Sequence, residues 1–241
     1  MFTWNNFIRG VLTMSEAGIE VRNDNNKLVV DSLYKNLMLS RKVSLSQMPA
    51  VNNEGTIARR LHLNRGEIVA AVSYPKGSRI GIIQLNFSGY CDFYGADLDY
   101  IDLSSIDSNY VAYVFGVDQK AKGNVGMQIF NDNGDLIFDS NAKYMRVSYY
   151  GKNADDVIQY PDASKTYAIA QLGVEAYEDT EYRSGEQNAF VTSVTRYVKL
   201  GKDGVEADGT YSGGYVYIPS YEEIHYEQKC FSYMLIDVTG Y

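Results

Sequence analysis

The chain has 241 residues and a formal net charge of −8 at pH 7, from 22 lysines and arginines against 30 aspartates and glutamates. Because a phosphate backbone is bound by clustered cations and no basic block occurs in the sequence, direct nucleic-acid binding is disfavoured. A hydrophobic fraction of 45% excludes a disordered or collagen-like chain, and no apolar stretch is long enough to predict a membrane anchor.

Tyrosine and phenylalanine are abundant, at 22 and 9 residues, while proline occurs only 4 times. Aromatic and β-branched side chains fit a pleated, half-buried surface, so this composition favours strands over helices. The sequence predicts a mainly β fold with little helix.

The first residues differ from a secretion signal, because Asn5 and Asn6 interrupt the apolar run that such a signal requires. Met14 opens the first recognisable domain and is an alternative start of translation. We expect residues 1–14 to form an N-terminal extension.

A repeat organises the chain. The segments 18–32, GIEVRNDNNKLVVDS, and 126–140, GMQIFNDNGDLIFDS, align without gaps at an offset of 108 residues and share seven of fifteen positions. Four of the other eight positions exchange one apolar residue for another. Self-similarity of this kind indicates two copies of one structural unit.

Each copy has the pattern of a β-hairpin. In the first copy, Ile19 and Val21 alternate with polar residues ahead of the polar cluster 23–26, and an apolar run follows that cluster. The cluster ends in Asn26 in the first copy and in Gly134 in the second. Asparagine and glycine are the residue types that most readily accept a positive φ, so both copies predict the same tight turn.

Further strand-like runs, bounded by turn residues, recur along both halves of the chain. Each half ends in an aromatic and β-branched run, at 109–117 and at 229–238. The Gly- and Asp-rich stretch 201–214 has the composition of a loop, and helical turns are suggested only at 15–19 and 33–41. The remaining predicted strands are 67–74, 78–87, 168–176, 189–200 and 214–218.

The repeat and the spacing of the runs predict two related β-sandwich domains in tandem. The first copy would occupy 15–120 and the second 121–241, with a polar, glycine-containing linker at 120–124.

Cys91 and Cys230 are the only cysteines, one in each half of the chain. This sparse usage is typical of reduced core residues in a protein that folds in a cytoplasm. A disulfide between them is the alternative.

The residue types that carry catalysis and metal binding are scarce. His62 and His225 are the only histidines, and each lies in a polar stretch typical of a protein surface. Asp24 and Asp132 raise the alternative of a calcium loop, but both copies lack the EF-hand spacing and its glutamate at the twelfth position. The sequence predicts no catalytic residue, no cofactor and no metal site.

Glycoside hydrolysis remains as an alternative, because it needs only two carboxylates. Asp92, Asp97 and Asp99 lie close together in the sequence, and Asp97 and Asp99 would share one face of a strand. Acidic residues beside turns are common without catalysis, so we expect a protein that is not an enzyme.

The second half contains a cluster of tyrosines. Tyrosine combines apolar area with a hydroxyl group at low entropic cost, and it is enriched at protein interfaces. Tyrosines at alternate positions can also simply pack on the faces of strands. A packing role and a role in contacts with a partner are therefore both open. The possible interface or glycan contacts are Tyr211, Tyr215, Tyr217, Tyr221 and Tyr226.

The hairpin segment 18–32, followed by Tyr34 and the basic pair Arg41 and Lys42, resembles the opening of small proteins encoded among the tail genes of tailed bacteriophages. The resemblance covers about the first thirty residues of each half. It implies a structural or adaptor component of the virion, most of all of the tail or tail tip, assembled in the bacterial cytoplasm. The implied partners are other tail proteins and copies of the chain itself, with no nucleic acid and no membrane anchor.

Two other functions are open from the sequence. One is a host-recognition module of the tail that uses the tyrosine cluster to bind a surface glycan or receptor. The other is a hydrolase that acts on envelope glycans through the carboxylates described above.

Overall fold

The computed structural model describes most of the chain, with gaps at loops and at the N-terminus. For the strand residues within 12–31, 176–193 and 210–230 it describes the backbone and its pairing alone. The described residues are 12–15, 18–22, 28–31, 36–53, 56–96, 106, 108–117, 125–131, 133–153, 157–182, 188–217 and 226–241.

The prediction of a mainly β fold is confirmed. The described part of the chain consists of antiparallel strands, and its one helical element is a short 3-10 turn at Leu45–Gln47. The chain divides into two compact units. The smaller unit contains 1–40, 65–68 and 115–145, and the larger contains 41–64, 69–114 and 146–241.

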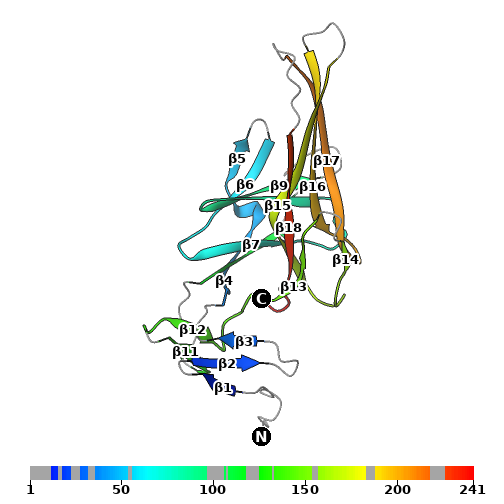
Figure 1. Cartoon of the computed structure of the whole chain (residues 1–241). Helices are drawn as coiled ribbons and strands as arrows, with labels where there is room; N and C mark the ends of the chain where they lie inside the picture. Colours follow the sequence, from blue (N-terminus) through cyan, green and yellow to red (C-terminus); the bar gives the residue numbers. More distant parts are fainter. Residues whose placement is uncertain are drawn as a thin grey trace. The chain divides into compact units, whose positions relative to one another are not determined.

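Two sheets build the larger unit (Figure 1). A four-stranded sheet has the order β5-β6-β9-β8, with β5 at Ala50–Asn53, β6 at Thr56–His62, β8 at Gly81–Phe87 and β9 at Tyr90–Ala96. A nine-stranded sheet has the path β14-β17-β16-β15-β7-β10-β4, and β18 pairs with both β13 and β15. Its strands are β4 (Met38–Ser44), β7 (Glu67–Ser73), β10 (Val111–Gly116), β13 (Val147–Gly151), β14 (Ile158–Gln159), β15 (Tyr167–Tyr182), β16 (Asn188–Leu200), β17 (Gly204–Tyr217) and β18 (Tyr226–Asp237).

Both sheets contribute to one apolar core in the larger unit. Phe93 from the four-stranded sheet and Tyr233 from the nine-stranded sheet are fully buried within it. Cys91 lies in the same core as a free thiol, as predicted, and burial raises its pKa to about 11. Cys230 lies on β18, where only the backbone pairing is described.

The compact units do not follow the predicted domains 15–120 and 121–241. Strand β7 from the first half lies beside β15 from the second half, with Val72 opposite Ile169. One core therefore draws on both halves of the chain, and the predicted linker 120–124 lies outside the described residues. Sequence periodicity shows where strands are and does not show which strands pair, so the pairing of β7 with β15 could not be predicted from the sequence.

The two repeated segments form matching hairpins, both in the smaller unit. In the first hairpin β2 (Gly18–Arg22) pairs with β3 (Leu28–Asp31), and β1 (Leu12–Ser15) pairs with the other edge of β2. In the second hairpin β11 (Gln128–Phe130) pairs with β12 (Leu136–Asp139). Each hairpin has three paired positions with a register shift before the third, and every pair of the first maps onto a pair of the second at the offset of the repeat.

The second hairpin shows what the repeated polar residues do. The side-chain Oδ1 of Asn131 accepts hydrogen bonds from the backbone N–H groups of Asn133 (3.1 Å) and Asp135 (2.8 Å), and Gly134 takes the predicted positive φ of 80°. Asp139 is buried, and its Oδ1 accepts the backbone N–H of Asn141 at 2.8 Å. These side chains hold the turn and the end of the second strand through hydrogen bonds to the backbone. The repeated polar residues of this hairpin therefore have a structural role. Asp24, Asn26 and Asp132 lie outside the described residues.

One predicted loop is a strand. The stretch 201–214 was expected to be a loop from its glycines, but β17 begins at Gly204 and continues to Tyr217. Thirteen residues of β16 pair with β17 without a break, and this ladder overrides the weak strand propensity of glycine. Gly204 is needed where it stands, because a Cβ there would overlap the carbonyl of Ile158 in the neighbouring β14.

The suggested helical turns at 15–19 and 33–41 do not form within the described residues. Ser15 ends β1 and Gly18 begins β2, while β4 begins at Met38. The other predicted strands agree with β7, β8, β10, β15, β16 and β18, and β15 is longer than its predicted range.

Candidate interaction surfaces

The tyrosine cluster falls on two strands of the nine-stranded sheet. Tyr211, Tyr215 and Tyr217 occupy alternate register positions of β17, so these three positions lie on one side of the strand. Tyr226 is the first residue of β18. Tyr221 lies outside the described residues.

The register separates Tyr226 from the other three tyrosine positions. Tyr226 pairs with Glu178 of β15, Glu178 with Ser193 of β16, and Ser193 with Ser212 of β17. This row is adjacent to the row of Tyr211, and adjacent rows of a pleated sheet lie on opposite sides. The four described positions among these possible contacts are therefore divided, with three on one side of the sheet and Tyr226 on the other.

The sheet that carries these positions is long. The eight residues from Glu175 to Tyr182 of β15 pair with β16, with β17 on the other side of β16, while β18 pairs with β15 as far as Glu178 (Figure 1). At about 3.4 Å per residue, this part of the sheet is roughly 25 Å long. Its strands carry aromatic positions at Tyr177, Phe190 and Tyr215, spread over three neighbouring strands.

The carboxylate of Asp92 is held by an arginine. Arg60 of β6 donates from Nε to Oδ1 at 2.7 Å and from Nη2 to Oδ2 at 2.6 Å, and the two residues face each other in the register of β6 and β9. The Asp92 side chain is fully buried, while 24% of the Arg60 side chain is exposed. This carboxylate is engaged in an ion pair. Asp97 and Asp99 lie outside the described residues.

An aromatic row lies next to this ion pair. His62, Tyr90 and Phe87 are paired across β6, β9 and β8. The rings of Phe87 and Tyr90 stack with centroids 4.7 Å apart and planes 17° apart, and the guanidinium of Arg60 lies 4.1 Å from the centroid of Tyr90. Phe87 is 44% exposed, and His62 is exposed as predicted. We call His62, Tyr90, Phe87 and Arg60 the aromatic row below.

On the side of the four-stranded sheet that carries the aromatic row, the part of the sheet farther from the row is packed against β16. Ile83 and Tyr94, which are paired on β8 and β9, pack with the fully buried Tyr197 of β16. The cover ends before Phe87, which is exposed. The aromatic row is thus the open end of a sheet surface whose other end belongs to the core.

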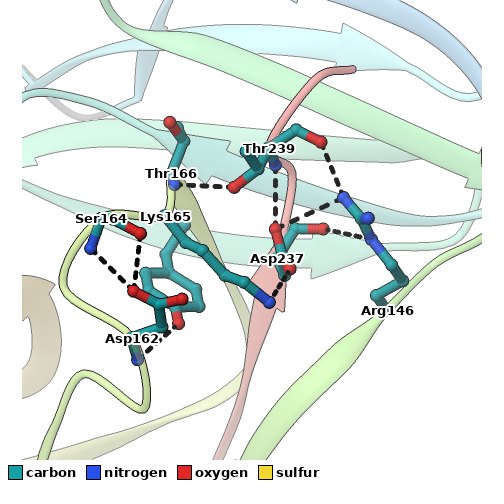
Figure 2. A network of polar contacts seen from close by, with 8 residues as sticks. Arg146, Asp162, Ser164, Lys165, Thr166, Asp237 and Thr239 are labelled. Atoms are coloured by element: carbon teal, nitrogen blue, oxygen red, sulfur yellow. Dashed lines mark hydrogen bonds and ion pairs between the residues drawn. The ribbon is translucent and has the colours of Figure 1, made fainter.

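A second polar cluster joins the end of β18 to two neighbouring segments (Figure 2). Asp237, with 5% of its side chain exposed, accepts the ammonium of Lys165 at 2.9 Å and the Nη2 of Arg146 at 3.3 Å. Thr239 donates its backbone N–H to Asp237 at 2.9 Å and accepts the backbone N–H of Thr166 at its hydroxyl, also at 2.9 Å. We call these five residues the Asp237 cluster.

The electrostatics of the Asp237 cluster favour the charged carboxylate. Burial opposes the charge, but the ammonium of Lys165, the hydrogen bonds from Thr239 and the guanidinium of Arg146 outweigh it, so the pKa of Asp237 lies below its usual value. Nearby, Asp162 accepts the N–H and the hydroxyl of Ser164, and these bonds lower the pKa of Asp162 as well. All of these contacts are internal, and they fasten the chain after β18.

A small buried cavity lies in the core of the larger unit. It has a volume of about 10 Å³ and is lined by Val72, Tyr74, Ile82, Gln84, Ile169 and Gln171. Gln84 donates to the carbonyl of Ala70 at 3.1 Å, whereas the side-chain amide of Gln171 has no partner among the described residues. The space is about that of a single water molecule, so it is too small for a substrate.

Comparison with known proteins adds no family to these observations. No family model, curated protein or solved structure matches the chain. No helix of the described residues is long and apolar enough to cross a membrane. Within the same residues, no group of three or more histidine, cysteine, aspartate or glutamate side chains is placed to hold a metal ion.

Sequence reasoning did not find the aromatic row. Its members come from three strands, and Arg60 and Asp92 are 32 residues apart in the chain. The available signal was the spacing of two residues between Arg60 and His62 and between Tyr90 and Asp92. This spacing indicates that the two residues of each pair lie on the same side of their strand. That these two sides are the same surface follows only from the pairing of β6 with β9. His225 lies outside the described residues.

Proposed function

We propose that this chain is a non-enzymatic structural or adaptor component of a bacteriophage virion, most of all of its tail or tail tip. Its partners would be other tail proteins and further copies of the chain. The proposal rests on the repeated hairpin segment, which resembles the opening of proteins encoded among phage tail genes. The strands within 18–32 and within 126–140 pair as hairpins in the same register, which agrees with the strand, turn and strand expected from that sequence pattern.

The long strands of the larger unit support a role in assembly. Tyr211, Tyr215 and Tyr217 lie at alternate positions of β17, on one side of a sheet in which β15 pairs with β16 over the eight residues 175–182. Tyrosine gives large contact area at low entropic cost, and it is enriched where protein surfaces meet. This side of β17 is our candidate for the contact with a neighbouring subunit.

Peptide mapping of purified virions tests the main proposal. Particles of the phage that encodes the chain should contain its peptides in fixed proportion to the other tail proteins. Electron microscopy of the same particles should place the chain in the tail. Mature particles that lack it would reject the proposal.

A double variant tests the candidate contact. Tyr215→Ala with Tyr217→Ala removes two positions from one side of β17, and we expect at least tenfold less of the chain in assembled particles. Tyr150→Ala is a matched control, because Tyr150 lies on β13 and is 48% exposed. Equal incorporation of the double variant and the control would show that this side of β17 carries no subunit contact.

A further inference from the structure

We propose that the outer edge of β17, over residues 209–217, pairs with the same edge of a second copy of the chain, so that two nine-stranded sheets join into one. The outer edge is the side of β17 that faces away from β16, and among the described strands β14 alone pairs with it, at Gly204 and Val205 (Figure 1). This pairing rests on the proposed role in assembly and deepens it, because it names the partner of β17 and the backbone atoms that bind it.

The backbone bonds at the start of β17 show which of its residues face the outer edge. On the side of β14, the carbonyl of Asp203 accepts the N–H of Tyr160 at 3.0 Å. On the side of β16, the carbonyl of Gly204 accepts the N–H of Gly201 at 2.8 Å. Such bonds alternate between the two neighbours along an antiparallel strand, and β17 keeps one register with β16 through thirteen pairs. Even-numbered residues of β17 therefore bond β16, and odd-numbered residues turn their N–H and C=O groups to the outer edge.

Gly209 agrees with this assignment. It is odd-numbered, and its N–H donates to the side-chain Oδ1 of Asp208, its neighbour in the chain, at 2.9 Å. No described strand pairs with the outer edge from this point to the end of β17. Donors and acceptors thus follow one another about every 7 Å along the edge. The residues that supply them after Gly209 are Tyr211, Gly213, Tyr215 and Tyr217.

This edge lacks the features that normally keep an edge strand from pairing. Charged side chains, proline and bulges usually interrupt such edges. The run 209–217, GTYSGGYVY, contains no charged residue and no proline, and its register with β16 has no shift. The other edge strands described in the larger unit, β4, β5, β8 and β13, have at most seven residues, and β4 carries Arg41 and Lys42. The run in β17 is therefore the best template for a further strand.

The same run is complementary to itself. A two-fold axis at Gly213 would pair the whole run with its copy in the opposite direction, and odd-numbered residues would then face odd-numbered residues. The Tyr211 position of one copy would lie opposite the Tyr215 position of the other, and aromatic cross-strand pairs stabilise a sheet. Glu206 and Asp208 would lie outside the paired run, so no like charges would face each other within it. A second copy thus matches both the hydrogen bonds and the charge of this edge.

Hydrogen exchange of the purified full chain tests the pairing, read at single residues by mass spectrometry with electron-transfer fragmentation. In the dilute monomer, β16 should protect the even-numbered amides of 210–216, while the odd-numbered amides of 211–217 exchange freely. Raising the concentration from about 1 μM to about 500 μM should protect the odd-numbered amides as well. Sedimentation velocity over the same range should show a monomer and a dimer with a dissociation constant in the micromolar range.

A pair of variants at one position tests the role of the backbone. Tyr211→Pro removes an outward N–H, and proline is tolerated in an edge strand where the N–H faces away from the neighbouring strand. Tyr211→Ala is the matched control, because it removes the same side chain and keeps the N–H. The dissociation constant of the dimer should be about tenfold larger for Tyr211→Pro than for Tyr211→Ala, since two hydrogen bonds are lost in each dimer. Circular dichroism compares the folds of the two variants, and if Tyr211→Pro is misfolded the exchange pattern of the unmodified chain decides.

Four outcomes would overturn the proposal. The first is a chain that stays monomeric at every concentration. The second is a dimer whose odd-numbered amides stay unprotected, because another surface, such as the tyrosine side of β17, would then hold the copies together. The third is protection of these amides in the dilute monomer, because the edge would then be covered within one molecule. The fourth is an equal dissociation constant for two folded variants.

The proposed function and this pairing can fail separately. Absence of the chain from mature virions would reject the role in the virion and leave the exchange experiment unaffected. A chain that is present in virions and stays monomeric in solution, with a free β17 edge, would reject the pairing and leave the proposed function in place.

Discussion

The larger unit contains two buried carboxylates that are stabilised in different ways. Asp92 is fully buried, and Arg60 bonds both of its oxygens. Asp237 is 5% exposed and divides its bonds among Lys165, Arg146 and the backbone of Thr239. One guanidinium thus contacts both oxygens of Asp92, whereas two cations and a backbone N–H contact Asp237.

The partners also differ in their access to water. Arg60 is 24% exposed, whereas Arg146 and Lys165 are 48% and 42% exposed. A cation near water can be rehydrated when its partner is lost, while a carboxylate left alone in a core cannot. Removing the Arg60 guanidinium should therefore destabilise the larger unit more than any loss in the Asp237 cluster.

The largest expected effect is that of Arg60→Met. It removes the guanidinium that bonds both oxygens of the buried Asp92 carboxylate, and breaking a buried ion pair in this way costs about 3–5 kcal/mol of unfolding free energy. Urea denaturation followed by circular dichroism measures it. The variant keeps most of the length of the arginine side chain, so lost packing on Tyr90 contributes little to the change.

The matched control is Arg60→Met combined with Asp92→Leu. Replacing a buried ion pair by apolar residues of similar volume is often neutral, so the double variant should recover most of the loss. If the double variant is as unstable as Arg60→Met alone, the cost comes from something other than the uncompensated carboxylate.

The second effect is that of Asp237→Ala. It removes the acceptor for Lys165, Arg146 and the N–H of Thr239, but both cations can turn to water, so we expect a loss of about 2 kcal/mol. Asp237→Asn is the control, since it removes the charge and keeps an acceptor, and it should cost less. A loss larger than that of Arg60→Met in the same urea experiment would reverse the comparison.

The strands and the hairpin at 126–140 are the parts of the structure that could be predicted from the sequence. The strands could be predicted because the alternation of apolar and polar residues is a local pattern. The hairpin at 126–140 could be predicted because its turn and both of its strands lie within one segment. The residues that close it, Asn131 and Asp139, belong to the repeat itself. Local pattern and local structure agree in this hairpin.

The rest depended on pairings between distant segments. The bond between Arg60 and Asp92 requires β6 to lie beside β9, and the single larger unit requires β7 to lie beside β15. The strand at Gly204 is fixed by its neighbours β14 and β16, against its own composition. The opposite sides taken by Tyr211 and Tyr226 likewise follow from the register across four strands.

The smallest expected effect is the pH dependence of the Asp237 cluster. The pKa of Asp237 is lower in the folded chain than in the unfolded one, so its stabilisation is complete above the unfolded value of about 3.9 and is lost as the pH falls through the folded value. The difference in unfolding free energy between the unmodified chain and Asp237→Ala should therefore be largest at neutral pH and should shrink as the pH falls into the acid range. Urea denaturation of both proteins over this pH range measures the difference directly, and acid effects common to both cancel. A difference that stays constant, or that grows in acid, would mean that the charge of Asp237 does not stabilise the cluster.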